Sequence, residues 1–136
     1  MGFLGLSEDK LMHIINDKFD KNYFIDGQKG VARFTFEELL KDTKGKLRYI
    51  CVNPSRNIFA FKIFEGNMVK DIGAKKLTKS LIKGAIIKRA KDICDSIFIE
   101  NNKYNFIVEI YNNIKDIKNN NYEFVQELKH FLIYYK

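Results

Sequence analysis

Cationic side chains that could bind a phosphate or another anion are concentrated in residues 74–91, AKKLTKSLIKGAIIKRAK. This stretch has no acidic residue, and the charges of the segments before and after it cancel, so it accounts for the whole net charge of +7. Its basic residues are Lys75, Lys76, Lys79, Lys83, Lys88, Arg89 and Lys91. Lysine ammonium groups neutralise backbone phosphates but carry little sequence information, so the stretch predicts binding to a nucleic-acid backbone, DNA or RNA, with low sequence specificity.

Two other anionic partners fit the same pattern of charge. One is an acidic protein: the second hypothesis is that this chain is an inhibitor or immunity-type factor that binds and covers such a target. Among the three anionic partners, a membrane comes last, because membrane binding needs large apolar anchors beside the lysines. The apolar stripe of this stretch is modest, and we expect the core to need it.

Patterns that indicate catalysis or metal binding are weak. The two histidines, His13 and His130, lie far apart in predicted helices, where a lone histidine is usually structural or solvated. No cluster of His, Cys, Asp and Glu has the spacing of a zinc site. The acidic loop at 20–27 fails as a calcium loop, because Phe24 occupies a ligand position. We therefore expect no metal, no cofactor and a non-catalytic protein.

A small RNase-type toxin is the third hypothesis. Such an enzyme needs general acid–base groups that converge on one scissile phosphate. The candidate residues are Lys46, Arg48, Tyr49, Arg56 and His130. A shared site requires the fold to bring these side chains together at an accessible surface.

The elements that would present these residues form an α+β fold, a small antiparallel sheet packed by three or four helices. Residues 31–34 are expected to be extended. Capping residues and helical spacing predict helices over residues 8–19, 36–44 and 122–135. The first helix is capped by Ser7 and the second by a capping box of Thr35 and Glu38.

The basic stretch is predicted as a helix over 74–95 that is broken near Gly84. On a straight helix the apolar stripes before and after Gly84 would point about 150° apart. Glycine costs about 1 kcal/mol against alanine inside a helix, so it favours a break there. A break would turn both apolar stripes toward the core and both basic faces toward solvent.

Runs of β-branched and aromatic residues predict a hairpin of residues 46–52 and 58–64, joined by the turn NPSRN. Both strands are apolar at nearly every position, so we expect the hairpin to be central, with both faces covered. Residues 68–72 are predicted as a third strand. Residues 96–111 are predicted as a second hairpin, with a helix over 104–118 as the alternative, since apolar residues there also recur at helical spacing.

Length and composition bound the remaining possibilities. A chain of 136 residues predicts one domain, 1–136. No run approaches the 18 or so apolar residues of a membrane span, and the first ten residues lack the pattern of a signal peptide. Cys51 and Cys94 are isolated, so we expect reduced thiols in a cytoplasmic protein.

Overall fold

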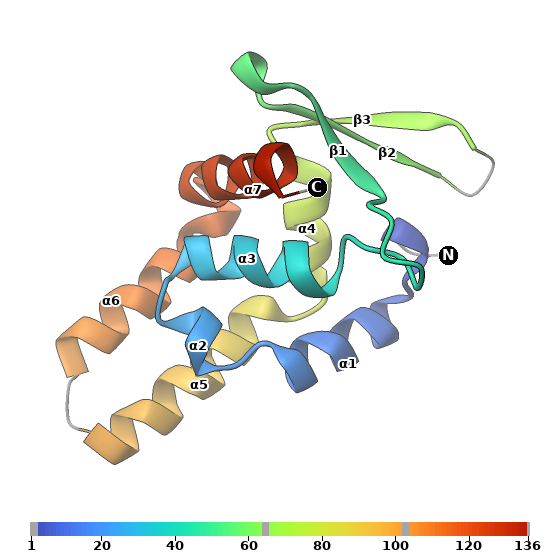
Figure 1. Cartoon of the computed structure of the whole chain (residues 1–136). Coiled ribbons are helices and arrows are strands. Elements are labelled where there is room, and N and C mark those ends of the chain that lie inside the picture. Colours follow the sequence, from blue (N-terminus) through green and yellow to red (C-terminus); the bar gives the residue numbers. More distant parts are fainter. Residues whose placement is uncertain (1–2, 64–65, 102–103, 136) are drawn as a thin grey trace.

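The computed structural model describes residues 3–63, 66–101 and 104–135, and in them helices outweigh strands (Figure 1). The α-helices are α1 Glu8–Lys18, α2 Lys21–Phe24, α3 Gln28–Glu38, α4 Lys75–Lys83, α5 Ile86–Asn101, α6 Tyr104–Lys115 and α7 Tyr122–Tyr134. The strands are β1 Tyr49–Asn53, β2 Ile58–Lys62 and β3 Met68–Ile72. Three short 3-10 helices are η1 Phe3–Gly5, η2 Pro54–Arg56 and η3 Asp116–Lys118. The chain is an α+β protein, as predicted.

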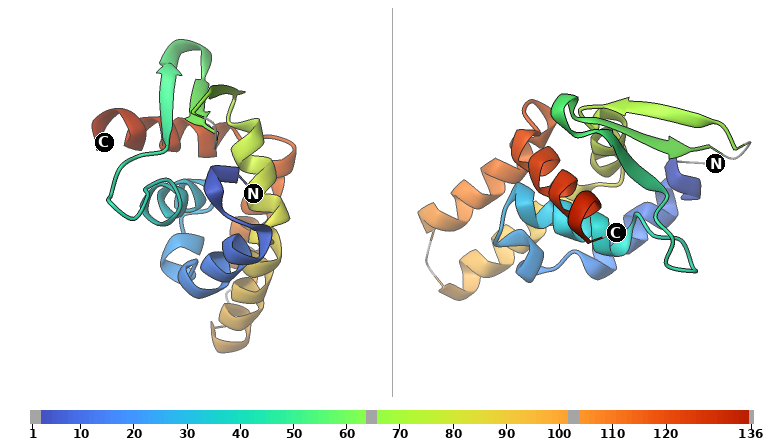
Figure 2. Two further views of the ribbon diagram at one scale, coloured as in Figure 1. Left: turned by 90° about the vertical axis from the view of Figure 1, so that its right-hand side faces the viewer. Right: turned by 45° about the horizontal axis from the view of Figure 1, so that its top comes forward.

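The sheet is antiparallel, with the strand order β1-β2-β3, and it lies along one side of the helices (Figures 1 and 2). Its inner face carries Tyr49, which pairs with Phe61, and Cys51, which pairs with Phe59. The rings of Tyr49 and Phe59 stack with centroids 5.3 Å apart. This face is buried against the helices and joins the sheet to the main core.

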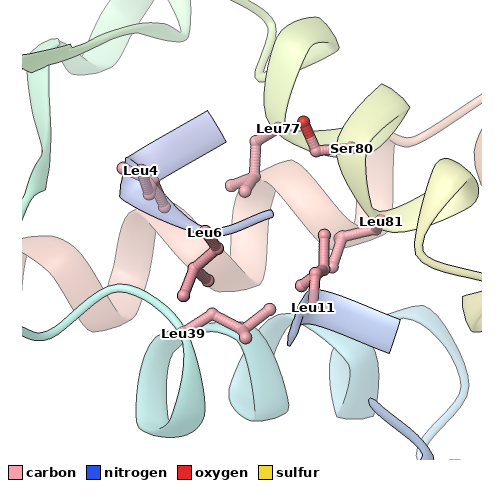
Figure 3. A pocket seen from close by; sticks show the side chains of 7 residues that line it. All are labelled: Leu4, Leu6, Leu11, Leu39, Leu77, Ser80 and Leu81. Atoms are coloured by element: carbon pink, nitrogen blue, oxygen red, sulfur yellow. The ribbon is translucent and has the colours of Figure 1, made fainter. Parts of the chain in front are cut away.

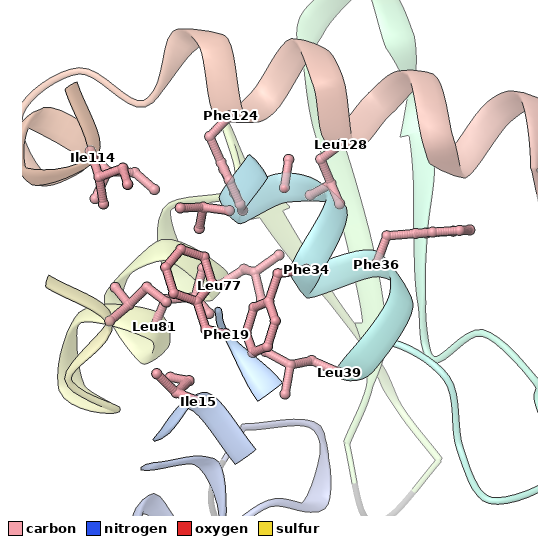
Figure 4. Packing of buried hydrophobic residues seen from close by; sticks show 14 of the residues in the cluster. Ile15, Phe19, Phe34, Phe36, Leu39, Leu77, Leu81, Ile114, Phe124 and Leu128 are labelled. Carbon is pink, nitrogen blue, oxygen red and sulfur yellow. The ribbon is translucent and has the colours of Figure 1, made fainter. Parts of the chain in front are cut away.

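One cluster of buried side chains joins the helices and the sheet (Figure 4). At its centre the ring of Phe19 meets the edge of Phe34, with centroids 5.3 Å apart. Helices α3 and α7 lie side by side, and Phe36 of α3 stacks on Phe131 of α7 at 5.3 Å. Burial of apolar side chains, aliphatic and aromatic, is the main stabilising term for such a core, and the ring pairs add to it.

A buried polar side chain, Gln28, joins α3 to the C-terminal helices. Its exposed fraction is 2%, and its Nε2 donates to the carbonyl oxygens of Asn113 (2.8 Å) and Asn120 (3.0 Å). Its Oε1 accepts a hydrogen bond from the backbone N–H of Phe124 (3.3 Å). Because every polar atom of this side chain is paired, its hydrogen bonds offset the cost of burying it, and it fixes the start of α7 against α3.

Several predicted elements are confirmed. Helix α1 matches the prediction for 8–19, and the Ser7 side chain accepts from the backbone N–H of Lys10 (3.1 Å). The hairpin of β1 and β2, the strand at 68–72 and the C-terminal helix are also present. Phe64, the last residue of the predicted hairpin, lies outside the described residues.

The prediction for 31–44 is wrong. Residues 31–34 are helical rather than extended, and the helix expected over 36–44 is instead α3, which ends at Glu38. The Thr35 hydroxyl does not cap a helix but donates to the carbonyl oxygen of Val31 (2.7 Å) one turn earlier. The N-terminus of α3 is capped from a distance, by the Asn113 Oδ1 that accepts from the backbone N–H of Gln28 (2.8 Å).

The second hairpin predicted for 96–111 is also wrong, and the alternative helix over 104–118 is confirmed as α6 followed by η3. Ile107, Ile110, Ile114 and Ile117 are buried along one face of this segment. The helical spacing of these residues therefore outweighs their β propensity. The predicted turn at Asn102 lies outside the described residues.

The expectation that the hairpin has two covered faces is wrong as well. β2 is the central strand, whereas β1 lies at an edge of the sheet. Ile50 and Val52 of β1 point away from the core and are 43% and 49% exposed. The apolar residues of β1 therefore occupy two faces, one packed against the core and one exposed.

Candidate nucleic-acid interface

Helix α4, which carries four of the seven candidate cations, is anchored at its start by the buried side chain of Asp71. The carboxylate accepts hydrogen bonds from the backbone N–H groups of Lys76 (2.8 Å) and Leu77 (3.1 Å). It also accepts from the hydroxyl of Tyr49 (2.8 Å). An anion beside the free N–H groups at a helix N-terminus is stabilising. Burial and the nearby Asp71 carboxylate raise the pKa of Tyr49, so this hydroxyl stays protonated and donates.

The tight turn before α4 gives Asp71 this position. Gly73 and Ala74 both have positive φ, at 64° and 54°, which reverses the chain between β3 and α4. The Asn121 side chain from the start of α7 donates to the carbonyl oxygen of Gly73 (2.9 Å) and to the Thr78 hydroxyl (3.1 Å). Helix α4 is therefore held at its N-terminus by the sheet and by α7.

The opposite side of α4 from its lysines packs into the core. Leu77 and Leu81 are buried, at 2% and 0% exposure, and point into the cluster of Figure 4. A hollow beside them is lined by six leucines and Ser80 (Figure 3) and has a volume of about 10 Å³. This is room for about one water molecule and the lining is almost wholly apolar, so the hollow is a packing void rather than a ligand site.

Lys75, Lys76, Lys79 and Lys83 are all exposed. At about 100° per residue, these four positions span an arc of only about 100°, centred opposite the buried leucines. Within the described residues, none of the four makes an ion pair or a side-chain hydrogen bond. We call these four side chains the α4 lysine face.

The predicted break at Gly84 is confirmed, and there is a steric reason for a glycine at this position. Helix α4 ends at Lys83 and α5 starts at Ile86, with Ala85 in the left-handed region at φ 69°. A Cβ at Gly84 would lie 2.9 Å from Leu11 Cγ and 2.9 Å from Ile15 Cδ1 of α1. Only glycine allows α1 to approach the chain this closely at the break.

The three candidate cations of α5 are already engaged. The Lys91 ammonium lies 2.6 Å from Asp95, and the hydrogen bond to that carboxylate raises the pKa of Lys91. The Lys88 ammonium lies 4.0 Å from Asp92 and its side chain is 80% exposed, so this is the weaker of the two ion pairs. These two exposed side chains carry carboxylate partners one turn later on the same helix.

Arg89 also has an internal role. Its Nε donates to the carbonyl oxygen of Phe19 (2.9 Å), which is the C-cap residue of α1. A guanidinium at a helix C-terminus pairs with an otherwise free carbonyl group and with the negative end of the helix dipole. Arg89 therefore ties α5 to α1.

Of the seven predicted residues, the structure gathers four on the α4 lysine face and leaves the three on α5 paired. The prediction missed Asp71, for which the sequence offered one signal, an acid two residues before Gly73 and four before the first residue of the helix. It also missed the pairing of Lys88 and Lys91. That pairing is readable in the sequence, since both acids follow at the i+4 spacing, just after residue 91.

Two of the five residues considered for an RNase site are held by contacts within the fold. Tyr49 is fully buried on Asp71, and Arg48 donates to the carbonyl oxygen of Leu4 (2.6 Å). Arg48 precedes β1 and Arg56 follows it, and a five-residue strand between them is about 17 Å long. His130 is exposed on α7, with its ring 4.9 Å from that of Tyr134.

Metal and thiol chemistry have little support in the described residues. None of their His, Cys, Asp and Glu side chains form a group of three that could hold a metal ion. Burial raises the pKa of both cysteine thiols, Cys51 and Cys94, so both are poor nucleophiles. Across the described part of the chain, no helix combines the length and apolar character needed to cross a bilayer.

Comparisons of the chain with protein-family models, with curated proteins and with solved structures found no match.

Proposed function

We propose that this protein binds the phosphate backbone of nucleic acid through the α4 lysine face, Lys75, Lys76, Lys79 and Lys83. The observation that carries the proposal is that four ammonium groups share one exposed face and lack carboxylate partners within the described residues. Four like charges on one face repel one another, and an anionic partner relieves that repulsion.

The dimensions of the face suit a polyanion. From Lys75 to Lys83 the helix rises about 12 Å. A duplex presents one phosphate charge per roughly 1.7 Å of its axis, so about seven phosphates lie along that length. Four flexible lysine side chains can each reach a different phosphate, and helix α4 itself is held rigid by Asp71 and Asn121.

The side-chain chemistry favours a phosphate backbone over a protein partner on this face. Protein interfaces are depleted in lysine and centre on apolar or aromatic residues, none of which lie among the four lysines. The same lack of aromatic rings removes the stacking platform that single-strand binders use. Lysine contacts position a backbone without reading bases, so the proposed binding has low sequence specificity.

The test is the salt dependence of binding to a fluorescein-labelled duplex, measured by anisotropy with a DNA and an RNA duplex. If the four lysines neutralise four phosphates, the slope of log K against log salt should be about −3.6. Replacing all four lysines by glutamine should abolish most of that slope. A flat salt response of the original protein would remove the proposal.

The matched control replaces four exposed lysines on other elements, Lys21, Lys29, Lys44 and Lys46, by glutamine. This variant has the same net charge as the α4 variant. It should keep the affinity within about threefold, because distant exposed charges are screened by salt. If both variants lose affinity equally, binding depends on net charge and not on the α4 lysine face.

A further inference from the structure

The outer face of the sheet is apolar and uncovered. The register of the strands places seven side chains on this face: Ile50, Ile58, Ala60, Lys62, Met68, Lys70 and Ile72. We add Val52, which is exposed at the register shift between Cys51 and Asn53. No helix of the described residues lies over this face in either view of Figure 2. We call these eight side chains the outer sheet face.

Four of the six apolar side chains of the outer sheet face are highly exposed. Ile50 is 43% exposed, Val52 and Met68 are each 49% exposed, and Ile72 is 61% exposed, whereas Ile58 is half-buried and Ala60 on the central strand is 4% exposed. These residues lie on neighbouring strands, as Ile50 pairs with Ala60 and Ile58 pairs with Ile72. Contiguous apolar surface of this kind marks an interaction site more often than scattered apolar residues do.

We propose that the outer sheet face docks a short acidic amphipathic helix of a partner protein. Charge is the first argument. The two charged residues among the eight are Lys62 and Lys70, both exposed and both cationic. A partner that combines an apolar stripe with flanking carboxylates would cover the isoleucines and pair with both lysines.

Size is the second argument. Five-residue strands are about 17 Å long and the two outer strands lie roughly 10 Å apart, which gives an area of roughly 200 Å². One helix is about 10–12 Å wide, so about three turns of helix cover the face. A second copy packed sheet on sheet would bring the lysines of one copy toward those of the other, whereas an acidic helix would pair with them.

The experiment uses the whole protein and a labelled peptide of about 12 residues, about 18 Å long as a helix, with leucines at helical spacing and glutamates on both flanks. Binding is followed by fluorescence anisotropy. A twin peptide carries lysine in place of every glutamate. The acidic peptide should bind at least tenfold more tightly than the twin, and Lys70→Glu should remove at least half of that preference on a logarithmic scale.

The apolar contribution is tested with the double variant Ile50→Thr with Ile72→Thr. Threonine keeps the β-branched shape, so the sheet should stay folded, which thermal unfolding checks. The variant should bind the acidic peptide at least tenfold more weakly. The matched control is Ile25→Thr, because Ile25 is also 43% exposed but lies after α2, away from the sheet. The control should leave binding unchanged.

Other occupants of the face give different results, and each would overturn the proposal. A second copy would appear as a dimer in sedimentation equilibrium that Ile50→Thr with Ile72→Thr dissociates. A lipid surface would appear as binding to phosphatidylserine vesicles that the same variant loses. Equal affinity for the acidic peptide and its lysine twin, or an unaffected threonine variant, would also contradict the proposal.

Discussion

Helices α4 and α5 follow each other in the chain and are both rich in cations, yet they differ in what those cations contact. The four lysines of α4 share one exposed face and have no carboxylate partner within the described residues. On α5, Lys88 and Lys91 lie next to Asp92 and Asp95, and Arg89 binds the backbone of α1. Net charge along a sequence therefore differs from the charge that remains available to a partner.

The difference arises from how each helix is held. Helix α4 is fixed by groups that leave its lysines alone: the Asp71 carboxylate, the Asn121 side chain and two buried leucines. Helix α5 is fixed to α1 partly through the cation Arg89 itself. A cation that holds the fold together is already desolvated and paired, so it has little left to offer a ligand.

The largest effect should come from removing the anchor of α4. Asp71→Ala removes the carboxylate that accepts from two backbone N–H groups and from the buried Tyr49 hydroxyl. We expect the free energy of unfolding to fall by about 3 kcal/mol, the sum of a lost helix cap and a lost buried hydrogen bond. Urea denaturation measures this loss. Asp92→Ala on α5 is the control and should cost less than about 0.5 kcal/mol, because that carboxylate is exposed.

The next effect compares the two helices directly by charge reversal. Lys79→Glu with Lys83→Glu on α4 should weaken binding to a labelled duplex at least hundredfold near 0.1 M salt, since two contacts become repulsive. Lys88→Glu with Lys91→Glu on α5 makes the same change in net charge but should weaken binding less than about fivefold, because those cations are already paired. Equal losses of affinity in the two variants would contradict the view that only the α4 lysines are available to a nucleic acid.

A smaller effect concerns the break that separates the two helices. Gly84→Ala places a Cβ against Leu11 and Ile15, so we expect a loss of about 2 kcal/mol in unfolding free energy. The neighbouring change Ala85→Gly relieves a left-handed alanine and should leave stability unchanged or raise it by up to about 1 kcal/mol. Denaturant titration of both variants tests the pair, and a fully stable Gly84→Ala would show that α1 does not depend on the close approach.

Local signals predicted the parts of the fold that depend on local contacts. The cap at Ser7, the β1–β2 turn and the break at Gly84 each depend on residues close together in sequence, and all three are confirmed. The start of α3 could not be predicted in this way. Its capping acceptor, Asn113, lies 85 residues further along the chain, while Thr35 and Glu38 offered a misleading local capping box.

Burial and pairing were harder to predict than secondary structure. The sequences of β1 and β2 are apolar at nearly every position, without the alternation of polar residues that marks a half-exposed strand. Such a sequence is typical of a strand covered on both faces, yet one face here is uncovered. The pattern of a single strand does not show whether an apolar face is covered by the core or exposed. The pairing on α5 is different, because it could have been predicted. Asp92 and Asp95 stand four residues after Lys88 and Lys91, and counting charge only as far as residue 91 left them out.

The smallest expected effect comes from removing the carboxylates of α5, which leaves its lysines unpaired like those of α4. Asp92→Asn with Asp95→Asn removes the carboxylates beside Lys88 and Lys91 without changing the size of either side chain. The freed cations add to the positive potential that attracts a polyanion, so the affinity for a duplex should rise about fivefold at low salt. The control, Glu38→Gln with Glu109→Gln, makes the same charge change at two exposed positions on α3 and α6 and should raise affinity by less than twofold.

The salt dependence of the Asp92→Asn with Asp95→Asn variant then shows whether α5 reaches the same ligand. A slope steeper by one to two phosphates, about 0.9 each, means that Lys88 and Lys91 contact the duplex bound by α4. An increase in affinity with an unchanged slope means that they act only through the long-range field. No increase at all would contradict the view that intrahelical carboxylates are what separates α5 from α4, and the difference would then lie in the direction that the two helices face.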